Sequence, residues 1–275
     1  MLERKNRIRM EVFNRVEKKY LLDDSVYQQL VKRLEEKMEL DAYHKGQRFY
    51  SIANIYYDTP SDELIRNSLE RPIYKEKLRL RSYGVPRMED LVFLEIKKKF
   101  GGVVNKRRTE FVLSEAYQYL HNRKPLKKSD SNINNRQVLQ EIDVFLERYN
   151  LQPKVFLAYD RVAFFGKEDR AFRVTFDTHI RARRERVRLE EGMEGTPLLE
   201  QGVWLMEVKI TGAAPLWFTR LLSEYRLYAT SFSKYGMEYK EYLLQKNLLK
   251  GEESLCLKQF LHQPVRPSYP FVQQY

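Results

Sequence analysis

Charged residues recur at every second position in several extended segments of this chain, a pattern suited to binding a polyanion. In the clearest case Lys75, Lys77, Arg79 and Arg81 share one parity. The same alternation recurs at 15–19, 95–99, 173–177 and 207–209. Because successive side chains of a β-strand point to opposite faces, each strand presents one cationic face with a few carboxylates. Five such strands indicate a shared polar interior, and Lys and Arg with one or two Glu suit a polyanion with its metal ion.

Each charged stripe also has a simpler interpretation. The stripe at 77, 79 and 81 could be an exposed edge strand whose charges prevent aggregation. Glu95 with Lys97, or Glu207 with Lys209, could be surface ion pairs. The run 97–99 resembles a nucleic-acid patch, but strand alternation turns Lys98 away from its neighbours. Repetition on five strands favours the lined interior. The sequence has no glycine-rich phosphate loop or kinase signature, so a nucleotide would have to bind on the strands.

Composition narrows the class of protein. The 275 residues include 50 Lys and Arg against 38 Asp and Glu, and the net charge of +12 indicates an anionic partner without identifying it. Hydrophobic residues make up 43%, enough for a sizeable core. The single cysteine, Cys256, excludes an internal disulfide framework and a cysteine-based zinc site. We see neither a signal peptide nor a transmembrane segment in the sequence, and we expect a cytoplasmic protein.

The elements that must position these charges are mainly strands. The patterns predict eight, at about 12–22, 48–57, 73–83, 91–99, 103–113, 153–165, 170–184 and 202–211. Helices are predicted after Ser25, at 61–70, at 114–150 with a break, at 214–227 and up to about 247. Short connections favour antiparallel neighbours, and eight strands can close a small barrel. We therefore expect an α+β fold, an eight-stranded antiparallel β-barrel with peripheral helices over residues 10–247, and an irregular or docked tail at 248–275.

Nine motifs, taken in this order, resemble the VTC domain, the catalytic domain of polyphosphate polymerases. That domain belongs to the triphosphate tunnel metalloenzyme fold of the CYTH-like superfamily. The matching motifs lie at 17–20, 57–59, 77–83, 94–97, 105–108, 158–164, 173–177, 206–209 and 233–235. Related triphosphatases open with Glu-x-Glu-x-Lys, whereas this chain has Arg15, Glu17 and Lys19 in those slots. An Arg in the first slot replaces a metal ligand by a phosphate donor, which resembles the VTC branch.

The resemblance implies a set of site residues. Those expected to line the tunnel and hold phosphates are Lys19, Arg79, Arg81, Lys97, Lys106, Arg161, Arg173, Lys209 and Lys234, and those expected to bind ATP are Lys77, Arg79, Arg81 and Lys209. Glu207 matches the family's metal-binding glutamate, with Glu95 as a second ligand for Mn²⁺ or Mg²⁺. Glu17 and Asp177 are auxiliary candidates.

The implied activity is ATP-dependent, metal-dependent synthesis of polyphosphate. The expected partners are ATP and inorganic polyphosphate, with no specific nucleic acid, and a membrane protein could receive the product. Two alternatives remain open: a tripolyphosphatase or nucleoside triphosphatase on the same fold, and a polyphosphate-binding sensor without turnover. A nucleic-acid binder is a third, and it predicts affinity for duplexes that falls steeply with salt.

Overall fold

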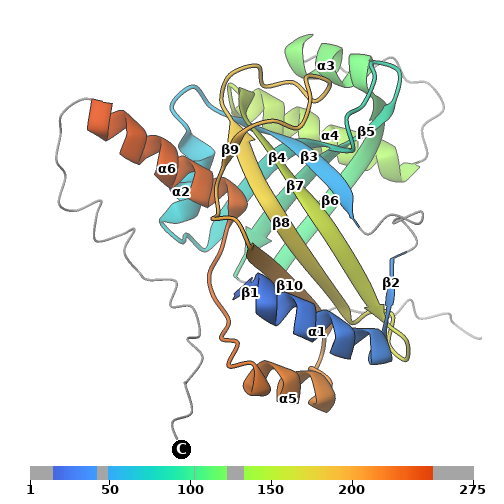
Figure 1. Cartoon of the computed structure of the whole chain (residues 1–275). Helices are drawn as coiled ribbons and strands as arrows, with labels where there is room; N and C mark the ends of the chain where they lie inside the picture. The colour runs from blue at the N-terminus through green and yellow to red at the C-terminus, as the bar shows by residue number, and fades with distance from the viewer. Residues whose placement is uncertain (1–14, 42–48, 102, 123–132, 250–275) are drawn as a thin grey trace, which may run out of the picture.

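The structure is a computed structural model that describes residues 15–41, 49–101, 103–122 and 133–249. One antiparallel sheet dominates it, with the strand order β1-β10-β8-β7-β3-β4-β5-β6 (Figure 1). The eight long strands are β1 (Arg15–Asp23), β3 (Tyr50–Asp58), β4 (Tyr74–Tyr83), β5 (Leu91–Phe100), β6 (Val103–Val112), β7 (Gln152–Gly166), β8 (Arg173–Arg183) and β10 (Val203–Thr211). Two short strands that the sequence did not predict are β2 (Met38–Leu40), paired with β7, and β9 (Thr196–Pro197), paired with β8.

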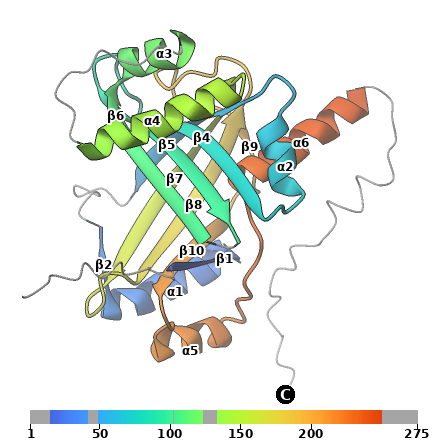
Figure 2. The same ribbon diagram turned by 180° about the vertical axis from the view of Figure 1, so that it is seen from behind.

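The sheet is curved but open, which corrects the closed barrel expected from the sequence. β1 and β6 are its edges, and no ladder joins them within the described ranges. β7 and β8 lie in front of β5 and β6 in Figure 1 and behind them in Figure 2, so the sheet folds back over one face. Residues 103–108 of β6 are exposed. Closure requires a definite stagger between the first and last strands, which the number of strands does not determine.

Two pairs of helices cover the outer, convex face. α1 (Asp24–Lys37) and α5 (Leu216–Glu224) pack on the half formed by β1, β10, β8 and β7. α1 buries Tyr27, Leu30 and Leu34 on one stripe, and Tyr27 stacks on Trp204 with 3.5 Å between ring centroids. α3 (Leu113–Asn122) and α4 (Ile133–Arg148) cover the half formed by β3, β4, β5 and β6. These layers hold the convex side of the sheet in an apolar core and leave the concave side for the charged residues and a third apolar cluster.

The remaining helices, α2 (Glu63–Leu69) and α6 (Lys234–Leu249), form this third apolar cluster with side chains of β3, β7 and β10. Tyr235 of α6 stacks on Tyr56 of β3, with 4.6 Å between the ring centroids. The first residue of α6, Lys234, is consequently buried at the concave side. In the part of the chain that the structure describes, no helix has both the length and the apolarity to span a membrane. Residues 10–14 and 250–275, which belong to the predicted domain and tail, lie outside that part.

Candidate active site

Alternate residues of the long strands place charged side chains on the concave side of the sheet, here called the inner face. On β4, β5 and β6, Lys77 lies opposite Lys97, which in turn lies opposite Lys106. Like charges directly opposite one another are destabilising, so this row lacks counter-charge of its own. The other half of the inner face places Glu207 opposite Lys19, Lys209 opposite Arg173, and Arg161 opposite Asp177.

Glu95 organises the first half of the inner face. Its side chain is 1% exposed, and it accepts hydrogen bonds from Arg79 at 2.7 Å (Nε) and 2.6 Å (Nη2). Lys106 Nζ lies 2.7 Å from the other carboxylate oxygen, and Arg81 Nε lies at 3.8 Å. Burial alone would raise the pKa of Glu95, but Arg79, Arg81 and Lys106 outweigh it and hold the pKa well below its usual range. Glu95 therefore remains ionised and fixes three cations.

Neutral side chains hold the other edges of the same arginines. Tyr56 Oη accepts a hydrogen bond from Arg79 Nη1 at 3.2 Å. Asn54 Oδ1 accepts one from Arg81 Nε at 2.9 Å, and Tyr159 Oη accepts one from Arg81 Nη2 at 3.3 Å. Planar guanidinium groups held in this way are preorganised for phosphate oxygens, because little side-chain entropy remains to be lost on binding.

Asp177 and Glu207 organise the second half of the inner face around Lys234. Lys234 Nζ lies 2.5 Å from Asp177 and 3.0 Å from Glu207. Asp177 also accepts two hydrogen bonds from Arg161, whereas Glu207 contacts Lys19 at 3.4 Å. Burial alone would raise the pKa values of both carboxyl groups. Arg161 and Lys234 outweigh burial and lower the pKa of Asp177. Lys234, Lys19 and Arg161 do the same for the pKa of Glu207. Burial would lower the pKa of Lys234, but Asp177 and Glu207 raise it. The cluster is therefore fully charged.

Several cations of the inner face are not neutralised in this way. Burial, assisted by neighbouring cations, lowers the pKa values of Lys77 and Lys209 to about 8; the pKa of Lys106 is also lowered to about 8, although Glu95 lies beside it. Arg173 packs over the Phe165 ring and contacts Asp41 through Nη2 at 3.4 Å, but its buried Nε has no acceptor among the described residues. At these lysines the nearby negative charge does not offset burial and the neighbouring cations. The inner face therefore fits an anion that carries several charges.

The family to which the chain belongs follows from a comparison with known proteins. The model of the VTC domain matches residues 14–243. The chain belongs to the VTC domain family. No curated protein sequence matches it closely enough to count as a relative.

Solved structures similar to this VTC domain include two candidate adenylate cyclases from bacteria. The one from Bacillus halodurans has 15% identity and a TM-score of 0.48, and the match covers 79% of this chain and 92% of that one. The one from Vibrio parahaemolyticus has 14% identity and a TM-score of 0.43, with 82% and 97% covered. A third, a candidate adenylyl cyclase from Hippeastrum described as having a dominant triphosphatase activity, has 17% identity and a TM-score of 0.48, with 89% and 99% covered.

All the basic residues predicted from the sequence lie on the inner face of this VTC domain or reach it from α6, and they fall into three sets. Arg79, Arg81 and Lys106 surround Glu95. Lys19, Arg161 and Lys234 surround Glu207. The third set has no direct contact with Glu95 or Glu207 in the described part of the chain, and it consists of Lys77, Lys97, Arg173 and Lys209. This arrangement places the cations together; their roles in binding stay predictions.

Sequence reasoning missed three uncharged members of the inner face and understated one carboxylate. Asn54 and Tyr56 of β3 and Tyr159 of β7 hold Arg79 and Arg81. The parity of Tyr159 with Arg161 was the available signal. Asp177, expected only as an auxiliary residue, instead binds both Arg161 and Lys234.

The two predicted metal ligands, Glu95 and Glu207, belong to separate clusters and share no cation partner in the described residues. Within the same residues, no group of three or more His, Cys, Asp or Glu side chains could hold a metal ion. Mg²⁺ commonly binds through one or two carboxylates with substrate phosphates and water. The donor set therefore fits a divalent ion that arrives bound to phosphate and gains one carboxylate, but it does not fit an ion held by protein alone.

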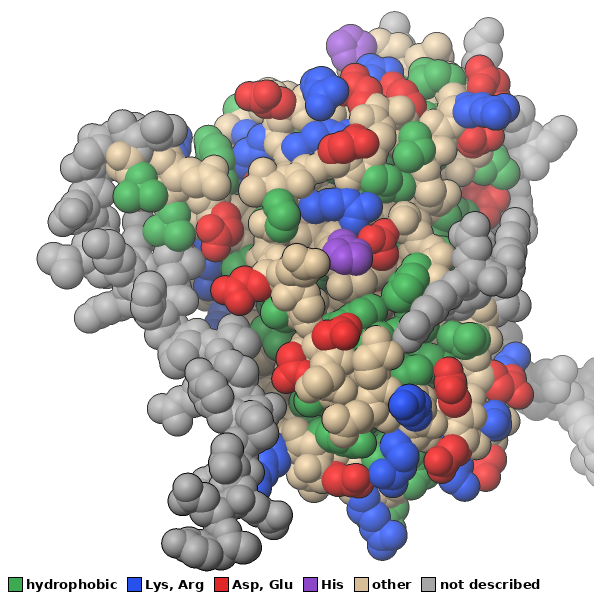
Figure 3. All heavy atoms as spheres, in the orientation of Figure 1, with side chains coloured by type: hydrophobic (Ala, Val, Ile, Leu, Met, Phe, Trp, Pro, Cys, Tyr) green, Lys and Arg blue, Asp and Glu red, His purple; other side chains and the backbone are tan. Residues whose placement is uncertain are grey.

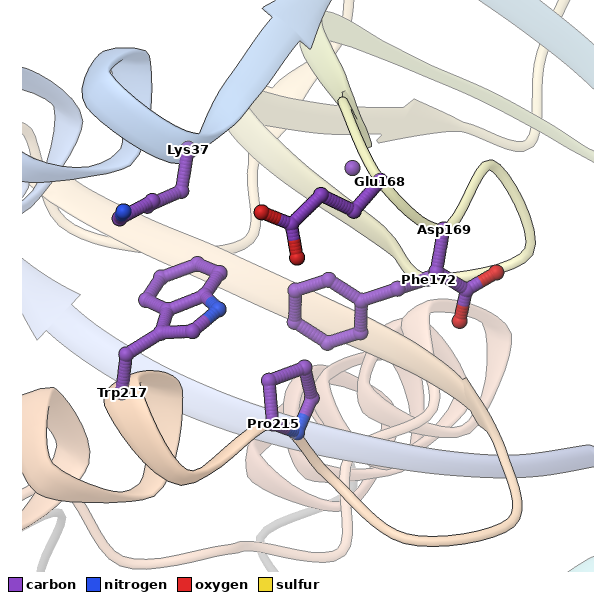
Figure 4. A pocket seen from close by; sticks show the side chains of 7 residues that line it. Lys37, Glu168, Asp169, Phe172, Pro215 and Trp217 are labelled. Atoms are coloured by element: carbon purple, nitrogen blue, oxygen red, sulfur yellow. The ribbon is translucent and has the colours of Figure 1, made fainter.

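Other surface features of the described residues add no second site. A cavity of about 160 Å³ lies on the outer side, where α1 ends, β7 turns into β8 and α5 begins; Figure 4 shows the Trp217 and Phe172 rings at its wall. It has no contact with the cations of the inner face. Figure 3 shows acidic and basic side chains interspersed on the face that is turned to the viewer in Figure 1. The described residues therefore form no continuous basic patch on that face.

Proposed function

We propose that this VTC domain is an ATP-dependent polyphosphate polymerase that works on its inner face with a divalent metal ion, Mn²⁺ or Mg²⁺. One observation supports this above all: cations from seven strands and α6 share a concave face on which three buried carboxylates are too few to neutralise them. Membership of the VTC domain family supports a function with polyphosphate or triphosphate. We further propose a cytoplasmic location and a membrane-protein partner, both from the family resemblance alone.

The proposed reaction transfers one phosphoryl group. A terminal oxygen of the polyphosphate chain attacks the γ-phosphorus of ATP, the bond from that phosphorus to the β–γ bridging oxygen breaks, and ADP leaves. The chain grows by one phosphate. The attacking oxygen is already anionic, so no general base is required, and catalysis depends on positioning and on stabilising negative charge.

The residues would divide these tasks by their geometry. Arg79, Arg81 and Arg161 are held rigidly by carboxylates, so they suit the fixed orientation of the reacting phosphates. Lys77, Lys97, Lys106 and Lys209, whose pKa values are lowered by burial, would hold the rest of the chain and regain full charge as phosphates bind. Glu207 would ligate the metal ion, which would supply positive charge to the reacting phosphates when bound.

A triphosphatase on the same inner face is the second candidate, with water as the acceptor. Arg15 begins β1, opposite Thr211, at the slot where related triphosphatases have a glutamate. This substitution favours the polymerase. A sensor would use the same cations without turnover, because binding does not require Glu207 to ligate metal.

The test is to incubate the purified protein with ATP and Mn²⁺ and to separate the products on a polyphosphate gel. We expect chains and ADP from the wild-type protein and no chains from Glu207→Ala or Arg81→Ala, with Glu207→Ala still binding tripolyphosphate. Glu39→Ala is the matched control, because Glu39 forms an exposed pair with Arg170. Orthophosphate without chains would contradict the polymerase and indicate a hydrolase. Tight binding with no turnover would indicate a sensor.

A further inference from the structure

The hydroxyl group of Tyr56 on β3 has an unfilled donor position. The residue is 8% exposed, and its oxygen accepts a hydrogen bond from Arg79 Nη1 at 3.2 Å. A phenol can accept and donate at once. Its own proton, however, finds no acceptor among the described residues. A buried donor without a partner costs free energy, so an absent group that accepts this proton would stabilise the site.

Three other buried or half-buried tyrosines are satisfied differently, whereas Tyr159 shares the arrangement of Tyr56, with Arg81 on its oxygen. Each of the three donates its hydroxyl proton to a carboxylate: Tyr235 to Asp58 at 3.0 Å, Tyr117 to Glu190 at 2.7 Å and Tyr119 to Asp143 at 2.5 Å. Tyr56 has the reverse arrangement, with an arginine on its oxygen. The group that would complete its bonding is a hydrogen-bond acceptor, and the neighbouring Arg79 favours an anionic one.

The position of the Tyr56 hydroxyl is fixed from two directions. Its ring stacks on Tyr235 of α6, with an interplanar angle of 22°. Glu95 holds the Nε edge of Arg79, so the Nη1 group that reaches Tyr56 is held as well. The next residue, Tyr57, has the opposite parity and packs in the apolar cluster on the outer face. Tyr56 and Tyr57 thus form a matched pair of tyrosines, one facing the cations and one facing away from them.

The charges acting on Tyr56 are cationic. They come from Arg79, Lys77 and Arg81 on β4 and from Lys97 on β5, while α6 contributes the neutral Tyr235 ring. Burial acts to raise the pKa of Tyr56, but Arg79 and Lys77 outweigh it and lower the pKa to about 8. A bound polyanion would reverse this balance, because it neutralises the cations and favours the protonated phenol.

We propose that Tyr56 is a phosphate-binding residue of the inner face, whose hydroxyl donates a hydrogen bond to an oxygen of the bound oligophosphate while accepting one from Arg79. This inference rests on the proposed function, since it takes an oligophosphate as the ligand. It adds a neutral, directional donor to a site whose other proposed phosphate ligands are cations. The hydroxyl also orients Arg79 toward the same phosphate.

Titration calorimetry with tripolyphosphate, without metal, compares the full chain with Tyr56→Phe and Tyr57→Phe. Both substitutions keep an aromatic ring, and only the first removes the hydroxyl from the inner face. A hydrogen bond to a charged group predicts an affinity about 10- to 100-fold weaker for Tyr56→Phe, with Tyr57→Phe near wild type. Equal affinities for all three proteins would overturn the proposal. If the wild-type protein does not bind tripolyphosphate, the result contradicts the proposed function itself.

A second measurement takes its main result from the wild-type protein, so it does not depend on whether a variant folds. At about pH 9, above the lowered pKa of Tyr56, the free wild-type protein contains tyrosinate that absorbs in the near ultraviolet. Tripolyphosphate should reprotonate it and reduce that absorbance, and the decrease should be absent in Tyr56→Phe and present in Tyr57→Phe. Binding that leaves the tyrosinate absorbance of the wild-type protein unchanged would show that the hydroxyl does not contact the ligand.

Discussion

Arg161 and Asp177 face each other on β7 and β8 and are joined by two hydrogen bonds, Nε to Oδ1 at 2.6 Å and Nη2 to Oδ2 at 2.7 Å. Their side chains are only 9% and 0% exposed. A carboxylate and a guanidinium so deep in the molecule are stable only because each has the other. Asp177 also binds Lys234, so a single carboxylate holds one cation of the sheet and one of α6.

We therefore expect Asp177→Asn to destabilise the fold strongly. The substitution leaves Arg161 and Lys234 buried without their main counter-charge, a change that typically costs about 3–5 kcal/mol. The free energy of unfolding in urea measures it. Glu39→Gln, which removes an exposed pair with Arg170, should change that free energy by about 1 kcal/mol or less. Similar losses for the two variants would contradict the assignment of Asp177 as a buried anchor.

The lowered lysine pKa values predict that the unliganded protein becomes more stable as the pH rises above 8. The pKa of Lys209 is about 8 in the fold against an ordinary 10.5, because of burial and nearby cations. Between these values the unfolded chain binds more protons than the folded one, so stability increases with pH. We expect Lys209→Met to remove about 1–2 kcal/mol of the gain between about pH 7 and pH 9.5.

The control is Lys32→Met, at an exposed lysine of α1. Urea unfolding at both pH values gives the comparison. An equal pH-dependent gain for wild type and Lys209→Met would show that Lys209 is not under electrostatic strain in the free protein.

Binding of an oligophosphate should be accompanied by proton uptake. At about pH 8.5 the lysines with pKa values near 8 are partly neutral, and phosphate raises their pKa again. Affinity should therefore be highest below pH 8 and decline as the pH rises beyond it. Calorimetry in two buffers of different ionisation enthalpy measures the protons taken up. Lys77→Met should reduce the number relative to wild type, whereas uptake identical in both would argue against Lys77 as a ligand.

The alternation of charged residues in the sequence predicted which side chains lie on the inner face, because these residues recur with the two-residue period of a β-strand. Lys97 faces inward, whereas its neighbour Lys98 points outward and contacts Glu141 of α4 at 2.6 Å. His179, which shares sequence parity with Asp177, does not follow this rule. The β7–β8 register shifts between Ala158 and Asp160, and His179 adopts a positive φ of 47° beside Asp160. A bulge of this kind interrupts the alternation of side chains between the two faces of the sheet, and no residue pattern in this sequence predicts it.

Contacts to backbone are equally hidden in a sequence. The arginine-rich run 181–186 carries no sustained strand-like alternation of charge in the sequence. In the structure Arg183 donates to the carbonyls of Gly192 and Glu194, and Arg184 forms two hydrogen bonds with Glu238 of α6. Carbonyl acceptors have no residue type, so the role of Arg183 could not be predicted, and the partner of Arg184 lies 54 residues away in the sequence. Tyr56 was missed for a related reason: one hydroxyl in an aromatic-rich strand forms no stripe.

Metal binding should depend on phosphate. Because the described residues offer no cluster of three or more carboxylate, imidazole or thiolate groups, Mn²⁺ alone should bind weakly, and tight binding should appear only with tripolyphosphate present. Electron paramagnetic resonance of free Mn²⁺ measures this directly, with tripolyphosphate alone as the reference for chelation in solution. Glu207→Gln should lose the extra affinity that the protein adds over this reference, whereas Glu39→Gln should retain it. Tight Mn²⁺ binding without phosphate would require a protein-only site and would contradict this prediction.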